Sequence, residues 1–563
     1  MRIDAGRLVI EADERGRLTA VAPRRAPEHR YLTEVDLAPG LVTDQDRVQA
    51  DTGDGLVSER ADHGWGEPAI EVDADEVTVR RRLAGLELTL RHGFSTGWTT
   101  RLLIVNTGAT DAHLERLPLT VRPAPGHRVS AHAAGSRLCW AVQAEDGQGP
   151  VLAARLTAGS VDRVTVDGLE LGPLRLAPGR RWVAQLRWDL YATPRSVLVG
   201  PGRDVLVERT AYEAGEGVLL PEDPDAALVV PQGVEVDLVE EPDRSGREVV
   251  ADEPGRHRIE LRSADGDVRL DLTWVRPLAD QLAVWAAQIL SGRRTPAGVV
   301  ALDDVPTALV LQAALGAGGL ADAEQAADAL DRLAARLQDD VAEGSAAGAA
   351  PLWVLYLLGE HGRTGDEDLL GAALELETRL LAEPGPPPPG LGLAVLRTVL
   401  AVGGSDHPDR LNPLLALAVA RVARVDGGRG GPVGEPRPAD LELLLAVRPL
   451  LPDDPARQSR LLAHVRALGA ALGGGLPGRL LAPPPVAEHA HLVAVLRMLP
   501  ERGAGDPGLS AVTRSWGAPP GLLAQRATLE VLDRLAPPAA DGTAAAPLDG
   551  TAAAWLSLVP RHG

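Results

Sequence analysis

The stretch VRLDLTWVRPLADQLAVWAAQILS, residues 268–291, contains a change of hydrophobic period. Up to Val275 apolar residues occupy every second position, which is typical of a strand with one buried face. After Pro277 the spacing becomes helical, and Ala and Leu dominate from there to the end of the chain. We therefore expect a multidomain chain that is β first and α afterwards, with antiparallel β-sandwiches followed by an α/α toroid of about twelve helices.

The first β segment covers residues 1–199 and predicts a β-supersandwich-like domain. Short alternating runs, such as Val77–Arg80 and Leu86–Arg91, are separated by turn residues such as Ala84-Gly85. Alternation broken by a turn indicates an antiparallel hairpin with one buried face. Gly, Pro and Asp interrupt these runs at short intervals, which favours a sandwich over a parallel α/β sheet.

A second β segment covers residues 200–275. Here Val234, Val236 and Leu238 alternate with acidic residues, and Asp265-Gly266 is a favourable hairpin turn. A segment of this length suits a small sandwich of immunoglobulin-like size. We expect either an independent small β-sandwich or an extension of the first domain.

Residues 276–563 form the predicted helical domain. Apolar residues recur at helical spacing, as at Leu369, Ala373, Leu376 and Leu380. Breaks rich in Gly and Pro separate such segments, and no repeat can be aligned residue by residue. Consecutive helical hairpins can close into a ring or continue as an open superhelix, and the absence of a repeat favours the closed ring.

The composition excludes several classes of protein. The chain has 57 basic and 78 acidic side chains and a net charge of −21, which disfavours nonspecific binding to nucleic acid or to an anionic membrane surface. Every basic side chain is an arginine, as a GC-rich genome would produce. The start of the chain lacks the apolar segment of a signal peptide, and no run of about 18 residues is apolar enough to span a bilayer. We expect a cytoplasmic protein.

Two stretches, Trp98–Gly108 and Leu176–Trp182, combine a strand pattern with an Asn-x-Gly or a Pro-Gly turn. Together with the order of the domains, they resemble the glycosidases and disaccharide phosphorylases that carry a β-supersandwich before an (α/α)6 barrel, including bacterial glucoamylase-like enzymes. The resemblance implies a glycosidase-like protein that acts on or binds an oligosaccharide. The paired carboxylates that such enzymes set among Trp and Tyr residues are not evident here. A catalytically degenerate relative and a non-catalytic scaffold or protein-interaction module are therefore the alternatives.

The predicted site lies at one mouth of the helical ring. Hydrolysis of a glycosidic bond needs two carboxyl groups roughly 5 to 10 Å apart. Asp303 and Asp304 precede a predicted helix, whereas Glu360 and His361 end an apolar helix that also carries Trp353. We predict catalytic roles for Asp303, Asp304 and Glu360, and binding roles for His361 and Trp353. The plainer interpretation of the acids and of His361 is that they cap helices and complement the helix dipoles.

No metal or cofactor is predicted. The most metal-like cluster is Glu488-His489-Ala490-His491, but the surrounding pattern is helical. Two residues that are two positions apart on a helix point about 200° away from each other, so the two histidines cannot easily share an ion. The single cysteine, Cys139, cannot form an internal disulfide, and the sequence contains no phosphate-binding loop or dinucleotide fingerprint.

Overall fold

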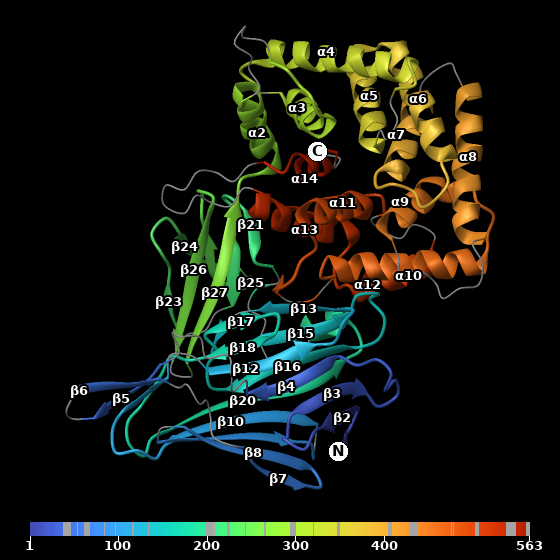
Figure 1. Cartoon of the computed structure of the whole chain (residues 1–563). Coiled ribbons are helices and arrows are strands. Elements are labelled where there is room, and N and C mark those ends of the chain that lie inside the picture. The colour runs from blue at the N-terminus through green and yellow to red at the C-terminus, as the bar shows by residue number, and fades with distance from the viewer. Residues whose placement is uncertain are drawn as a thin grey trace.

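The computed structural model has a β-rich N-terminal half and a helical C-terminal half (Figure 1). It describes all residues except 38–46, 53–54, 61–67, 84, 96, 115–116, 133, 199–206, 208, 222–225, 242–243, 264–265, 293–299, 319, 346–349, 404–407, 428–436, 475, 477, 501–505, 536–547 and 559–563. Strand β27 (Gly266–Val275) ends the β half, and helix α2 (Leu278–Gly292) begins the helical half. The predicted fold class, antiparallel sheets followed by an α/α layout, is confirmed.

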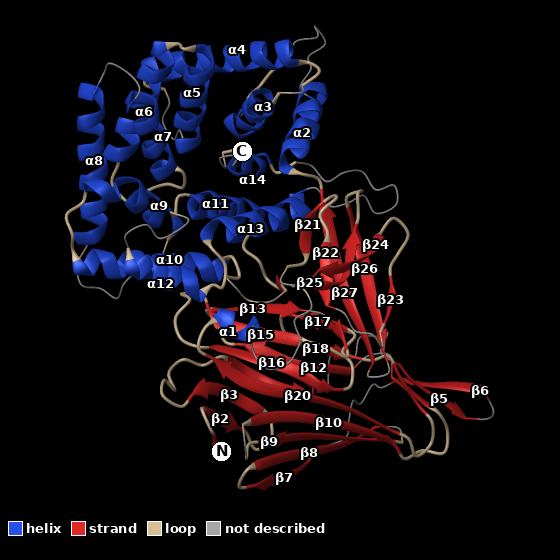
Figure 2. Cartoon of the chain, turned by 180° about the vertical axis from the view of Figure 1, so that it is seen from behind, coloured by secondary structure: helices blue, strands red, loops and turns tan. Residues whose placement is uncertain are grey.

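Two large antiparallel sheets form the first sandwich, which Figure 2 shows in red below the helices. The seven-stranded sheet runs in the order β1 (Arg2–Ala5), β2 (Leu8–Ala12), β3 (Leu18–Pro23), β4 (Leu32–Leu37), β12 (Leu117–Pro123), β18 (Gly168–Leu171) and β17 (Arg163–Thr165). The nine-stranded sheet runs in the order β28 (Arg479–Leu480), β13 (His127–His132), β15 (Cys139–Ala144), β16 (Val151–Ala158), β20 (Arg181–Tyr191), β10 (Trp98–Asn106), β9 (Leu86–Gly93), β8 (Glu76–Leu83) and β7 (Ala69–Asp73). A smaller sheet contains β19 (Leu174–Leu176), β11 (Ala112–Leu114), β5 (Arg47–Thr52) and β6 (Gly55–Arg60), and the short helix α1 (Pro194–Leu198) follows β20.

The predicted hairpin is present in the nine-stranded sheet. Strands β8 and β9 pair antiparallel, with Val79 opposite Leu90. Both residues are buried in the core that the two large sheets share. In the same core the rings of Trp98 and Trp188, from neighbouring strands, stack with their centroids 4.1 Å apart. The alternating apolar residues therefore supply the buried face, as the period of two predicts.

A separate hydrophobic cluster lies within the second β segment. One sheet contains β14 (Ala134–Gly135), β27, β26 (Gly255–Ser263) and β23 (Ala227–Val229), and β21 (Ala211–Glu213) pairs parallel with β27. The other sheet runs in the order β22 (Val218–Pro221), β25 (Arg244–Val250) and β24 (Glu235–Glu241). The expected alternation along β24 holds only in part. Val234 is buried at the start of the strand, but Val236 and Leu238 are 40% and 63% exposed because β24 is an edge strand.

The helices of the C-terminal half close into a ring. Their bounds are α3 (Val305–Ala317), α4 (Ala323–Ala342), α5 (Pro351–Thr364), α6 (Glu367–Ala382), α7 (Leu391–Gly403), α8 (Pro408–Gly427), α9 (Pro438–Val447), α10 (Pro455–Ala471), α11 (Val486–Arg497), α12 (Pro507–Ser515), α13 (Pro520–Leu535) and α14 (Gly550–Ser557), with a 3-10 turn at Arg448–Leu450. Helices α3, α5, α7, α9, α11 and α14 contact one another in this order, and α14 returns to α3. The remaining helices pack around them, as in an α/α toroid.

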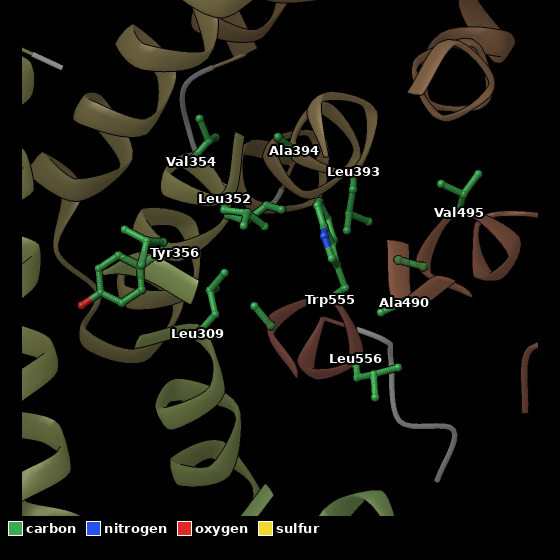
Figure 3. Packing of buried hydrophobic residues seen from close by; sticks show 14 of the residues in the cluster. Leu309, Leu352, Val354, Tyr356, Leu393, Ala394, Ala490, Val495, Trp555 and Leu556 are labelled. Carbon is green, nitrogen blue, oxygen red and sulfur yellow. The ribbon is translucent and has the colours of Figure 1, made fainter. Parts of the chain in front are cut away.

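The centre of the ring is packed with apolar side chains. Figure 3 shows Leu309, Leu393 and Val495, from three of the inner helices, around Trp555 of α14. The ring of Tyr356 in α5 points away from Trp555, and its hydroxyl donates a hydrogen bond to a backbone carbonyl of the outer helix α4. All five are buried. The described residues at the middle of the toroid thus form a hydrophobic core. No helix within the described ranges combines the length and the apolar character that a membrane span requires.

The two halves are joined by a strand that the helical half contributes to the sandwich. The two residues of β28, between α10 and α11, pair antiparallel with Ser130 and Ala131 of β13. Gly478, just before β28, has a positive φ of 78°, and a Cβ atom there would lie 1.8 Å from the carbonyl oxygen of Ala131. Helix α13 also contacts β21 and β27 of the small β segment. The helical half therefore contacts both β segments.

Candidate functional site

The structure gives Asp304 a role at the end of a helix. It is the N-cap of α3, and its Oδ1 accepts a hydrogen bond of 2.8 Å from the backbone N–H of Thr307. Asp303 precedes it and is exposed. This is the geometry by which an aspartate stabilises the first turn of a helix.

Glu360 is fully buried in α5. Its carboxylate accepts a hydrogen bond of 2.6 Å from Nε2 of Gln312, and Arg363 donates to it from Nε at 2.9 Å. Gln312 lies eight residues after Asp304, which corresponds to about 12 Å along α3. The structure therefore does not bring Glu360 and Asp304 to one point.

The two predicted binding residues also have structural contacts. Nδ1 of His361 lies 2.9 Å from the carbonyl oxygen of Asp366, beyond the end of α5. Trp353 is half-buried and packs against the core of the ring. A catalytic role for the three acids and a binding role for these two side chains stay predictions.

A larger site lies at the junction of the three parts of the chain. A cavity of about 860 Å³ opens between β17 of the large sandwich, β26 and β27 of the small β segment, and β28, α11 and α13 of the helical half. The charged and imidazole side chains among its lining residues are Arg163, Arg256, His257, Arg258, Asp271, Arg479, His489, Glu530, Asp533 and Arg534. We call this cavity the junction pocket. It is large enough for an extended ligand, since ligand clefts typically span roughly 300 to 1,000 Å³.

Four of the five arginines of the junction pocket divide into two groups. Arg256 donates to Asp533 from Nε at 3.1 Å and from Nη2 at 2.9 Å, and Nε of Arg258 lies 2.9 Å from Oδ1 of Asp271. Arg163 and Arg479 are exposed, and the guanidinium group of neither has a hydrogen bond or an ion pair to any residue that the structure describes. These two guanidinium groups are therefore available to an anion. A guanidinium group favours carboxylates and sulfates because it can donate two parallel hydrogen bonds.

His489 of α11 contributes a buried, uncharged imidazole to the wall of the pocket. Burial is the main reason why its pKa is lowered to about 3, and the positive charges of Arg534 and Arg128 lower it further. Nδ1 of His489 lies 3.3 Å from Nη1 of Arg534, which also donates to the carbonyl oxygen of Pro484 at 2.8 Å. Its Nε2 has no hydrogen-bond partner in the described part of the chain.

Two of the three acids of the pocket, Glu530 and Asp533, lie on α13, whereas Asp271 lies on β27. Burial raises the pKa of Glu530 of α13, and nearby Arg526, with Nε 3.5 Å from Oε1, opposes that shift. Asp533 lies one turn further along α13 and pairs with Arg256 of β26. The α13 side of the pocket is thus acidic, whereas the β17 and β28 sides present the unpaired arginines.

The junction pocket could not be predicted from the sequence. Its residues come from separated stretches of the chain, as far apart as residues 163–166 and 530–534, and no local spacing connects them. One lining residue, His489, does stand out in the sequence, because it belongs to the Glu488-His489-Ala490-His491 cluster. Both histidines of that cluster are buried on a helix, and the described residues contain no group of three or more His, Cys, Asp or Glu side chains that could hold a metal ion.

Comparison with known proteins identifies the fold but not the family. No known family profile matches the sequence, and no curated protein matches it either. Among solved structures, a protein described as a polysaccharide lyase superposes with a TM-score of 0.63 at 13% sequence identity. The match covers 94% of this chain and 93% of the other. The two proteins therefore share the β-then-α fold over nearly the whole length of both chains.

Proposed function

We propose that this protein binds an acidic carbohydrate in the junction pocket. The observation that carries the proposal is the concentration of five arginines around one cavity, against three carboxylates, on a chain whose net charge is −21. Arginine is the only basic side chain available to this sequence, but codon usage does not explain why the arginines gather at this place. A cluster of positive charges on an otherwise acidic protein attracts an anionic ligand to that place.

The chemistry of the lining suits a sugar that carries carboxylate or sulfate groups. Arg163 and Arg479 supply guanidinium groups on two sides of the cavity. Three threonines, Thr165, Thr210 and Thr273, are also among the lining residues, and a threonine hydroxyl can exchange hydrogen bonds with sugar hydroxyls. The pocket is therefore equipped for both the charges and the hydroxyl groups of an acidic oligosaccharide.

The shared architecture supports carbohydrate as the ligand over a purely protein-binding scaffold. The solved structure with this fold is described as a polysaccharide lyase. The same fold is also compatible with the glycosidase activity implied by the sequence resemblance, in which Asp303, Asp304 and Glu360 would act at the mouth of the ring. These two proposals place the ligand in different parts of the chain, so substitutions can distinguish them.

The test is calorimetric titration with acidic oligosaccharides, namely oligogalacturonate, oligoalginate and a chondroitin sulfate oligosaccharide, with maltohexaose as the neutral comparison. We expect binding of at least one acidic oligosaccharide and a loss of affinity of tenfold or more in Arg163→Gln and in Arg479→Gln. Arg25→Gln removes an exposed arginine outside the pocket and is the matched control, which should bind like the wild type.

The outcomes separate the two sites. If Asp304→Asn and Glu360→Gln abolish binding while the arginine variants do not, the ring mouth is the site and the junction pocket is not. If no acidic oligosaccharide binds to the wild type, the proposed function is wrong. Assaying the same mixtures for unsaturated sugar ends and for reducing ends then shows whether binding leads to elimination, to hydrolysis or to no reaction.

A further inference from the structure

The sheet formed by β22, β25 and β24 has an uncovered edge. Strand β25 pairs with β22 on one side and with β24 on the other, and within the described residues β24 has no second neighbour. In the register of the sheet, Val218 and Val236 both lie opposite Val249. Side chains that are directly opposite in antiparallel strands share one face of the sheet. The three valines therefore form a row that crosses the sheet on its core-facing side.

Exposure rises along this row toward β24. Val218 is 3% exposed and Val249 is fully buried, whereas Val236 is 40% exposed. The next row shows the same change, since Leu220 is 1% exposed and Leu238, which also lies opposite Arg247, is 63% exposed. Val236 and Leu238 thus lie on the core-facing side of the sheet but outside its buried part. A further strand beside β24 would continue both rows and shield them.

The opposite face of β24 is acidic. Glu235 and Asp237 are exposed there, and Asp237 lies directly opposite Glu248 of β25. A basic side chain on a neighbouring strand, directly opposite such exposed carboxylates, is favourable. An added strand would therefore need apolar side chains on one face and basic side chains on the other.

We propose that β24 is a docking edge for an extended, basic segment of another protein, which pairs with it as an additional strand. The apolar residues of that segment cover Val236 and Leu238, and its alternate basic residues lie beside Glu235 and Asp237. Main-chain hydrogen bonds supply much of the affinity in such strand addition, and alternate side chains supply the specificity. A second copy of this chain does not fit, because pairing two β24 edges would bring their acidic faces together.

This inference is independent of the proposed carbohydrate site. No residue of β24 lines the junction pocket, so loss of one interaction leaves the other measurable. The side chains of Val236 and Leu238 are already exposed, and a strand can be added without unfolding the sandwich.

The test uses the full chain and a synthetic peptide of alternating arginine and valine or leucine, seven residues long. Fluorescence anisotropy measures binding, and hydrogen exchange shows which strand becomes protected. We expect saturable binding with protection of the amides of residues 235–241. Leu238→Ser should weaken binding tenfold or more, and Asp237→Asn should weaken it at least threefold at low salt. Leu450→Ser, at a 50% exposed leucine in the helical half, is the matched control.

Each other outcome overturns the proposal. Two further peptides serve as controls, one with glutamate in place of arginine and one with the same composition in scrambled order. If either binds equally well, β24 does not recognise the alternating basic pattern. Unchanged binding by Leu238→Ser places the contact elsewhere. Absence of binding to the wild type rejects the basic occupant. Self-association that Leu238→Ser abolishes identifies a second copy of the chain as the occupant.

Discussion

Glu442 and His491 lie on neighbouring inner helices, with Nε2 of the imidazole 2.9 Å from Oε2 of the carboxyl group. The same carboxyl group accepts hydrogen bonds of 2.8 Å from the backbone N–H groups of Gly390 and Leu393, at the start of α7. The ring of Trp555, from α14, lies with its centroid 4.7 Å from that of His491. One buried side chain thus connects α7, α9 and α11 beside the helix that closes the toroid.

Replacing Glu442 should destabilise the toroid. In Glu442→Leu, two buried N–H groups and an imidazole nitrogen lose their partner, and each unpaired buried group costs about 1 to 3 kcal/mol. We expect the free energy of unfolding to fall by about 3 kcal/mol or more, measured by urea denaturation. Glu343→Leu, at an exposed glutamate, should change it by less than about 0.5 kcal/mol. A loss no larger than in this control would show that the hydrogen bonds of Glu442 contribute little net stability.

The contact between the halves can be tested with a pair of glycines. Gly478 and Gly365 both have positive φ angles, 78° and 74°, but only Gly478 lies against another backbone, that of Ala131. Gly365→Ala should cost about 1 kcal/mol for the left-handed conformation alone. Gly478→Ala adds a steric clash that must displace β28 from β13, so we expect a total loss of about 3 kcal/mol or more in thermal or urea unfolding. Equal losses in the two variants would contradict a role for close packing at Gly478.

Glu377 should make the stability of the protein depend on pH. It is buried in α6, where it accepts a hydrogen bond of 2.5 Å from Oγ1 of Thr398, and burial raises its pKa to about 8. Between the ordinary value of 4.5 and about 8, the folded state keeps a proton that the unfolded state releases, so stability falls as the pH rises through this window. Glu377→Gln removes this dependence. Between pH 5 and pH 8 the free energy of unfolding of the wild type should therefore fall, relative to that of the variant, by on the order of 3 kcal/mol.

The control for this prediction is Glu343→Gln, which replaces an exposed glutamate. Its stability should follow the wild type at every pH. Parallel curves for Glu377→Gln and the wild type would mean that Glu377 is ionised in the folded protein.

Asp533 should limit the affinity of the junction pocket for anions. It occupies Arg256 through two hydrogen bonds, and its charge opposes any acidic ligand nearby. Asp533→Asn should therefore raise the affinity for an acidic oligosaccharide about three- to tenfold at low salt, with a smaller gain at high salt because both effects are screened. Calorimetric titration measures the change, and Asp252→Asn, at an exposed aspartate, is the control. A fall in affinity would show instead that Asp533 holds Arg256 in its binding position.

The fold class could be predicted because burial imposes a period on each half of the chain. Val79 and Leu90 alternate with polar neighbours, and Leu369, Ala373 and Leu380 recur at helical spacing, since one face of each element is buried. Leu238 shows the limit of this reasoning. Its place in the alternation is regular, but whether another layer covers it depends on the arrangement of the sheets.

The site was harder to predict for two physical reasons. An acid beside a helix end has the same local sequence whether it caps the helix, as Asp304 does, or faces a ligand. The junction pocket, in contrast, forms where stretches as distant as Arg163 and Arg534 meet. Arg479 lies in the two-residue strand β28, and its position beside the pocket follows only from the pairing of that strand with β13.

The pairing of β28 with β13 has a consequence for how the chain can be divided. If the chain were cut at the change of hydrophobic period, the N-terminal piece would lose β28 from its sandwich, and the outer edge of β13 would be open to other chains. An open edge is a template for aggregation. The helical half therefore covers an edge of the sandwich through residues 479–480. A truncated chain, or a chimaera that separates the two halves, needs another strand in their place.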